Sequence, residues 1–185
     1  MSDVGQGTGT GAGAGAGTQN AERQARIDLL GIYLNDHLAG STIGSRRIHY
    51  MVRALRDSPL AEALRPIADE IAQDRATLLD IMSRLGVPAR RYKILAADAA
   101  EKAGRLKPNG RLLRRSPLTS VVELEFLQLG VEGKAAGWRM LRRLAESDGR
   151  LDRQQLDDLI ERARRQLRTL EELRLQHAEK ALRTR

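Results

Sequence analysis

The sequence predicts an all-α protein in which four long helices form a bundle of two helical hairpins. First, the 185 residues are rich in Leu, Ala, Arg and Glu, and only 3% are aromatic, which favours helices over strands. Second, apolar residues recur at three- and four-residue spacing in four long segments. Third, Ser-Pro pairs at 58–59 and 116–117 are typical of helix starts. A chain of this length makes one domain whose core needs no disulfides, and it contains no cysteine.

The first two helices are predicted over residues 21–56 and from Ser58-Pro59 to Gly86. The stretch Gly40–Gly44 interrupts the first helix and indicates a kink or a close approach of another helix. Pro88 follows the end of the second helix, where it is common. The second helix has the most regular apolar stripe in the chain, and one of its members is an aspartate. This stripe consists of Leu60, Leu64, Ile67, Ile71, Asp74, Leu78, Ile81 and Leu85.

The last two helices are predicted over residues 117–147 and from residue 151 to near the C-terminus, with a tight turn at Asp148-Gly149. The connection between the two hairpins, about 30 residues with a short amphipathic helix, is long enough to run the length of the bundle as a crossover. The second and third helices are therefore expected to run parallel and to begin at the same end. Residues 1–19, rich in glycine, are expected to form a disordered tail before the bundle of residues 20–185.

Parallel helices place Asp74 and Glu132 at the same depth, because each lies fifteen residues after the proline that begins its helix. Glu125 precedes Glu132 by two helical turns, so both carboxylates point the same way. Their neighbours on that face are apolar, and we expect the face to lie against the core. These neighbours are Leu118, Val121, Val122, Leu129 and Ala136. His37 and Glu70 fall near the same level. The sequence therefore predicts a buried polar cluster, with Gln128 and Gln166 beside it, whose candidate metal ligands are Glu132, Asp74, Glu125, His37 and Glu70.

Three stretches of the chain, YLNDHLAGS, EIAQDRATLLDIMSRLGVP and SPLTSVVELEFLQLGVEGK, resemble those of uncharacterised bacterial ferritin-like proteins. The resemblance covers residues 21 to about 182 and implies a four-helix bundle with a single long crossover. Members with two metals use a Glu from each of two helices and a Glu-x-x-His pair from each of the other two. Here Gln73 stands where a histidine would follow Glu70, and the fourth helix has no such pair either. A metal site would therefore be degenerate, and iron oxidation is not carried over.

Two interpretations of the predicted cluster stay open. Carboxylates with one imidazole suit iron, manganese or zinc, so the cluster could be a modified metal site. Alternatively, Arg139, Arg143 or Arg164 could neutralise the acids in an internal ion-pair network. The incomplete pairs favour a protein that is not an enzyme, and no combination of Ser, His and an acid supports nucleophilic catalysis.

Two further function classes concern the surface. The net charge of +8 favours polyanions, but no DNA-reading motif or aromatic stacking platform is present, so nucleic-acid binding is not favoured. The third helix is apolar on more than one side, so either the connection between the hairpins or a second subunit is expected to cover it. We predict a homodimer through that helix, and a non-enzymatic dimeric interaction module is therefore an alternative function. The second apolar face of this helix contains Leu127, Val131, Trp138 and Leu141. No secretory signal or membrane span is recognisable, and a cytoplasmic location is expected.

Overall fold

The computed structural model describes residues 12–90 and 117–183, and these residues form four α-helices and no strand. The helices are α1 (Ala12–Ala54), α2 (Pro59–Arg84), α4 (Pro117–Leu144) and α5 (Arg153–Arg183). The all-α, four-helix prediction is therefore confirmed. None of the helices within the described ranges is long and apolar enough to span a membrane.

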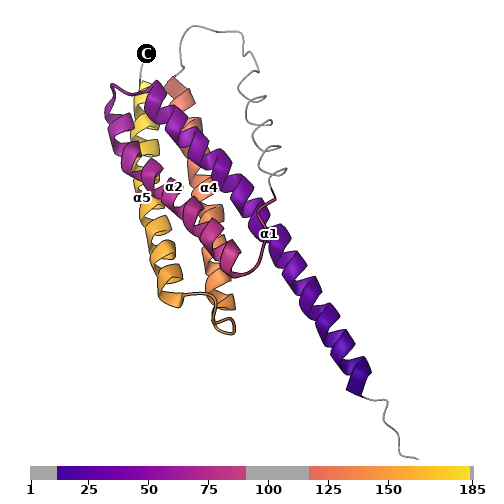
Figure 1. Ribbon diagram of the computed structural model, residues 1–185. Coiled ribbons are helices and arrows are strands. Elements are labelled where there is room, and N and C mark those ends of the chain that lie inside the picture. The colour runs from indigo at the N-terminus through magenta and orange to yellow at the C-terminus, as the bar shows by residue number, and fades with distance from the viewer. Residues whose placement is uncertain (1–11, 91–116, 184–185) are drawn as a thin grey trace, which may run out of the picture.

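The helices form two antiparallel hairpins, α1 with α2 and α4 with α5, and α1 also packs along α4 (Figure 1). Helices α2 and α4 both begin at the same end of the bundle and run parallel, as predicted (Figure 1). The packing of the core agrees with this parallel direction. Leu64, near the start of α2, shares a cluster with Leu124, near the start of α4. Ile81, near the end of α2, shares the other cluster with Leu141, near the end of α4. The short helix predicted between the hairpins lies outside the described residues.

The ends of α2 follow the signals read from the sequence. Ser58 has extended backbone angles, and its Oγ accepts a hydrogen bond from the backbone N–H of Ala61, as an N-cap does. At the other end, Gly86 adopts φ +72°, the backbone N–H of Val87 donates to the carbonyl of Met82, and that of Gly86 donates to Ser83. This pair of bonds is a Schellman motif, and glycine permits its left-handed residue without strain.

Helix α1 begins earlier than predicted, at Ala12 instead of residue 21. Residues 12–19, which we assigned to the disordered tail, are helical, and the rest of that tail lies outside the described residues. Alanine alternates with glycine here, and its high helix propensity offsets part of the cost of glycine. The N-terminal part of α1 extends past the ends of the other three helices (Figure 1).

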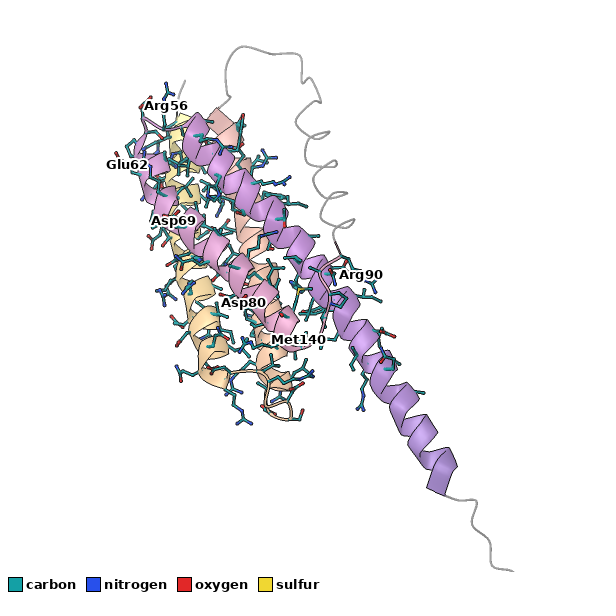
Figure 2. The ribbon with its side chains drawn as sticks, in the orientation of Figure 1. Arg56, Glu62, Asp69, Asp80, Arg90 and Met140 are labelled. Atoms are coloured by element: carbon teal, nitrogen blue, oxygen red, sulfur yellow. The ribbon has the colours of Figure 1, made fainter. Side chains whose placement is uncertain are left out.

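The core consists of two apolar clusters separated by a polar layer. The cluster at the α4–α5 turn includes Leu38 and Trp138, and the cluster at the α1–α2 turn includes Met51 and Leu127. Asp74 is buried in the layer between them, and so is Gln166 of α5. Charged side chains such as Glu62 and Asp69 instead lie on the outer surface of α2 (Figure 2).

The predicted orientation of α4 is wrong. Its core side is the second apolar face of the sequence analysis, and Leu127, Val131 and Trp138 are buried there. On the face assigned to the core, Val122 and Leu129 are 61% and 75% exposed. Both faces carry large apolar residues, so periodicity alone did not distinguish them. The face on which the homodimer was predicted is thus buried inside the bundle, and the homodimer through α4 stays a prediction.

Candidate functional site

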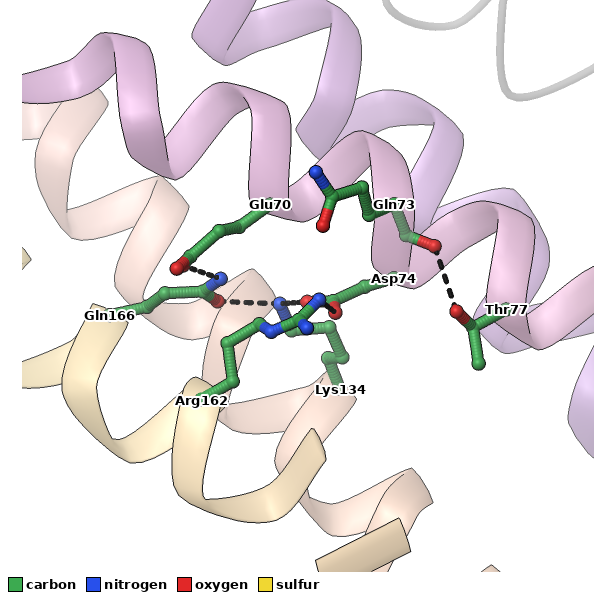
Figure 3. A network of polar contacts seen from close by, with 7 residues as sticks. All are labelled: Glu70, Gln73, Asp74, Thr77, Lys134, Arg162 and Gln166. Atoms are coloured by element: carbon green, nitrogen blue, oxygen red, sulfur yellow. Dashed lines mark hydrogen bonds and ion pairs between the residues drawn. The ribbon is translucent and has the colours of Figure 1, made fainter. Parts of the chain in front are cut away.

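A buried ion-pair network crosses the middle of the bundle between α2, α4 and α5 (Figure 3). The side chain of Asp74 is only 1% exposed and binds two cations. Lys134 of α4 donates to its Oδ2, and Arg162 of α5 donates from Nη1 to its Oδ1 at 2.9 Å. Burying a carboxylate costs several kcal/mol unless it is paired in this way, so the two cations are what allow an aspartate in the apolar stripe of α2.

Two further residues extend the network. Lys134 Nζ also donates to Gln166 Oε1 at 2.6 Å, and Gln166 Nε2 donates to Glu70 Oε2 at 2.7 Å (Figure 3). Burial lowers the pKa of Lys134 from its ordinary value, and the attraction of Asp74 offsets part of that effect. With two acids and two cations, the network is neutral as a whole when all four groups are charged.

The predicted ligands Glu125 and Glu132 do not belong to this network, and the expectation that they face the core is wrong. Glu132 is 56% exposed and accepts from Arg139 Nη2 at 2.7 Å. Glu125 is 50% exposed and lies 3.7 Å from Arg174 of α5. Gln128, also placed in the cluster, donates instead to Glu171 Oε2 at 2.7 Å. These side chains form surface links because α4 is rotated away from the predicted orientation.

Glu171 is the centre of one such surface link. Hydrogen bonds from Arg174 and from Gln128 lower the pKa of Glu171 to about 2, so it is charged at neutral pH. Arg174 contacts Glu171 and Glu125 together, which joins α5 to α4. This link is exposed, and exposed ion pairs contribute little to stability.

His37 also lies apart from the acids. Its ring packs edge-on against Tyr33, with ring centroids 4.4 Å apart, and it faces Gly137 of α4. Of the five predicted metal ligands, the structure joins only Asp74 and Glu70, through Gln166 and Lys134. Across residues 12–90 and 117–183, no group of three or more His, Cys, Asp or Glu side chains is arranged to hold a metal ion. The alternative interpretation, an internal ion-pair network, assigned the positive charges to Arg139, Arg143 or Arg164. In the structure Lys134 and Arg162 pair with Asp74 instead.

Burial lowers the pKa of His37, and the nearby Asp36 only partly opposes this. The unfolded chain, with a histidine pKa of about 6.5, therefore binds more protons than the folded chain just below that pH. Stability is expected to fall as the pH drops from about 6.5 toward the lowered pKa of the folded state. Urea unfolding midpoints between pH 5 and 8 measure this, and His37→Gln should flatten the pH dependence. An unchanged slope in the variant would show that another group causes it.

A cavity of about 410 Å³ lies on the other side of the network, between α1, α2 and α4. Asp74 and Lys134 belong both to the network and to the wall of the cavity. Most of the remaining wall is apolar. These apolar residues are Leu34, Ile43, Ile71, Leu78, Phe126, Leu127, Leu129, Val131, Trp138 and Leu141.

Five of the described glycines line this cavity, and three of them, Gly40, Gly130 and Gly133, are exposed to solvent. Gly40 and Gly44 of α1, and Gly130 and Gly133 of α4, line it, and a Cβ added at any of them would meet no atom within 4 Å. Helix α1 continues through the Gly40–Gly44 stretch, and no other helix of the described residues approaches these two glycines closely. Gly137 differs, because a Cβ there would lie 3.1 Å from the His37 ring.

Two polar groups in the wall have unused hydrogen-bonding capacity. Arg75 donates from Nε to Thr42 Oγ1 at 3.0 Å, and in the described part of the chain no carboxylate lies within ion-pair distance of it. Trp138 is buried, and its Nε1 has no hydrogen-bond partner among the described residues. A buried N–H left in this way costs about 1–3 kcal/mol, and the half-buried Arg75 guanidinium is suited to an incoming acceptor.

Sequence reasoning missed Lys134, Arg162 and Arg75. A signal for Lys134 was present, because Leu127, Val131, Lys134, Trp138 and Leu141 recur at alternating spacings of four and three. A lysine inside an apolar stripe that faces an aspartate inside another is the pattern of a buried ion pair. For Arg162 the sequence offers no comparable signal, because it is one of many arginines on a helix with an exposed charged face, and Arg75 is marked only by its place next to Asp74.

Comparison with protein-family models, with curated proteins and with solved structures finds no match, so the ferritin-like resemblance stays a prediction.

Proposed function

We propose that this protein is a non-enzymatic binding protein that takes up one small, largely apolar molecule in the cavity between α1, α2 and α4. The observation that carries the proposal is the cavity itself, about 410 Å³ of space bounded mainly by apolar side chains and glycines. Its volume falls in the range of about 300–1,000 Å³ that is typical of ligand sites. A few polar groups in an apolar wall are also typical, because they orient a ligand that apolar contacts hold.

The energetics of the glycines support this proposal. A glycine inside a helix costs about 1 kcal/mol relative to alanine, so the four glycines together cost the helices about 3–4 kcal/mol. Glycine is useful in a helix where another chain or a ligand must approach the backbone closely. Within the described residues no side chain or backbone atom approaches Gly40, Gly44, Gly130 or Gly133 from across the cavity. Gly40, Gly130 and Gly133 are exposed, so the helix backbone there is open to a molecule that enters from the surface.

Trp138 offers a direct test, because it is the single tryptophan of the chain and lines the cavity. Titration with the neutral fluorescent probe N-phenyl-1-naphthylamine is expected to show saturable binding at one site per chain, with energy transfer from Trp138. Gly133→Leu places a side chain in the cavity and should abolish binding while the protein stays folded by circular dichroism.

The matched control is Ala136→Leu, one turn further along α4 on an exposed position outside the cavity wall. It adds the same side-chain surface and should leave binding unchanged. Equal binding by wild type and both leucine variants would place the probe elsewhere on the surface and would refute the proposal.

A further inference from the structure

We propose that the molecule bound in this cavity is an amphipathic monocarboxylate, with an apolar body among the leucines and its carboxylate on Arg75. This inference rests on the proposed function and adds the chemical class of the ligand. Two observations carry it: the charge balance of the wall, in which the terminal nitrogens of Arg75 have no acceptor among the described residues, and the apolar character of the remaining lining.

The charge balance identifies Arg75 as the cation available to a ligand. Lys134 also lines the cavity, but Asp74 and Gln166 already accept hydrogen bonds from it. Arg75 uses only its Nε, on the hydroxyl of Thr42, so its two terminal nitrogens have no acceptor among the described residues. Asp36 is the other acid of the wall, and it is exposed, so water screens its charge. A half-buried guanidinium in this position favours an anion.

Trp138 lines the same cavity, but its Nε1 is buried and exposes essentially no surface to it. Its indole is 3% exposed, and its Nε1–H has no partner in the described part of the chain. A buried N–H donor with no acceptor is rare and costs about 1–3 kcal/mol. Arg75 is a cationic donor, so it favours an acceptor-rich group over an amine. Because arginine binds a carboxylate through two parallel hydrogen bonds, a carboxylate suits the geometry of this site.

The rest of the wall defines the other end of the ligand. Ile71, Leu78, Leu127 and Leu141 offer only apolar contacts, and the four glycines leave room beside the helix backbones. An alkyl chain or a compact ring can bury its surface there at a gain of about 25 cal/mol per Å². A small polar acid would leave this wall unoccupied and would bind weakly.

The test compares three ligands of equal chain length, dodecanoate, dodecanol and dodecylamine, each kept below its micelle-forming concentration. Affinity is measured by displacement of N-phenyl-1-naphthylamine and by Trp138 fluorescence. Wild type is expected to bind dodecanoate about tenfold or more tightly than dodecanol, as a charge-assisted hydrogen bond implies, and dodecylamine most weakly. Equal affinities for the acid and the alcohol would overturn the inference without any variant.

Variants then locate the anion. Arg75→Gln is expected to weaken dodecanoate about tenfold and to change dodecanol by less than about twofold, whereas Arg75→Lys keeps a preference for the acid. Arg65→Gln, on an exposed position of the same helix outside the cavity wall, should change neither affinity. If Arg75→Gln weakens the binding of dodecanoate and dodecanol equally, Arg75 shapes the cavity and does not bind the carboxylate.

The two proposals fail in different ways. If the probe and all three ligands bind neither to wild type nor to Ala136→Leu, the proposed function is refuted. If the probe binds and Gly133→Leu abolishes it, but dodecanoate has no advantage over dodecanol, only the carboxylate assignment is refuted.

Discussion

Replacing Asp74 by Asn is expected to lower the free energy of unfolding by about 3–5 kcal/mol, the largest loss predicted for any polar substitution in this chain. The amide keeps the shape of the aspartate but removes the negative charge that both Lys134 and Arg162 bind. The Lys134 side chain is only 13% exposed, so little water is available to replace the lost carboxylate. Urea unfolding at pH 7, followed by circular dichroism, gives the midpoint and the slope from which this loss is obtained.

Glu132→Gln is the matched control for this prediction. It removes one carboxylate charge at the same depth of the bundle, but from an exposed ion pair with Arg139, so a change within about 0.5 kcal/mol is expected. The double variant Asp74→Leu with Lys134→Met should regain much of the lost stability, because it removes both buried charges together. Similar effects of Asp74→Asn and Glu132→Gln would contradict the network described above.

Replacing the four open glycines of the cavity by alanine is expected to raise the free energy of unfolding by about 2–4 kcal/mol in the ligand-free protein. Each alanine gains helix propensity, and a Cβ at Gly40, Gly44, Gly130 or Gly133 meets nothing within 4 Å. Thermal or urea unfolding of the quadruple variant measures the gain. A loss of stability would show that the space beside these glycines is filled in the folded protein.

Gly137→Ala provides the contrast, because it is the same substitution in the same helix with the opposite expected sign. Its Cβ would lie 3.1 Å from the His37 ring, which already packs against Tyr33 and has little room to move. We expect a loss of about 1 kcal/mol from overpacking. A gain equal to that at Gly133 would mean that the His37 ring shifts without cost.

The sequence by itself determined the helices and their directions. The Ser58 side chain caps the start of α2, and Gly86 adopts the left-handed backbone angle that ends it. Both requirements depend only on neighbouring residues of the chain. The length of the connection between the hairpins predicted that α2 and α4 run parallel. Counting from Pro59 and Pro117 then placed Asp74 level with Glu132, and Asp74 does bind a residue of α4 only two positions further along, Lys134.

Only the tertiary structure decided which side of α4 faces inward. Two positions along a helix change the depth by about 3 Å but turn the side chain by about 200°, so a correct depth is compatible with the opposite face. Leu129 and Leu127 are equally apolar, and the sequence had no local reason to bury one and expose the other. Packing against α1 and α5 buries the side with Val131 and Trp138, which brings Lys134 to Asp74 and leaves Glu132 in water. The cavity likewise depends on how glycines from α1 and α4 meet across the bundle, which no single helix specifies.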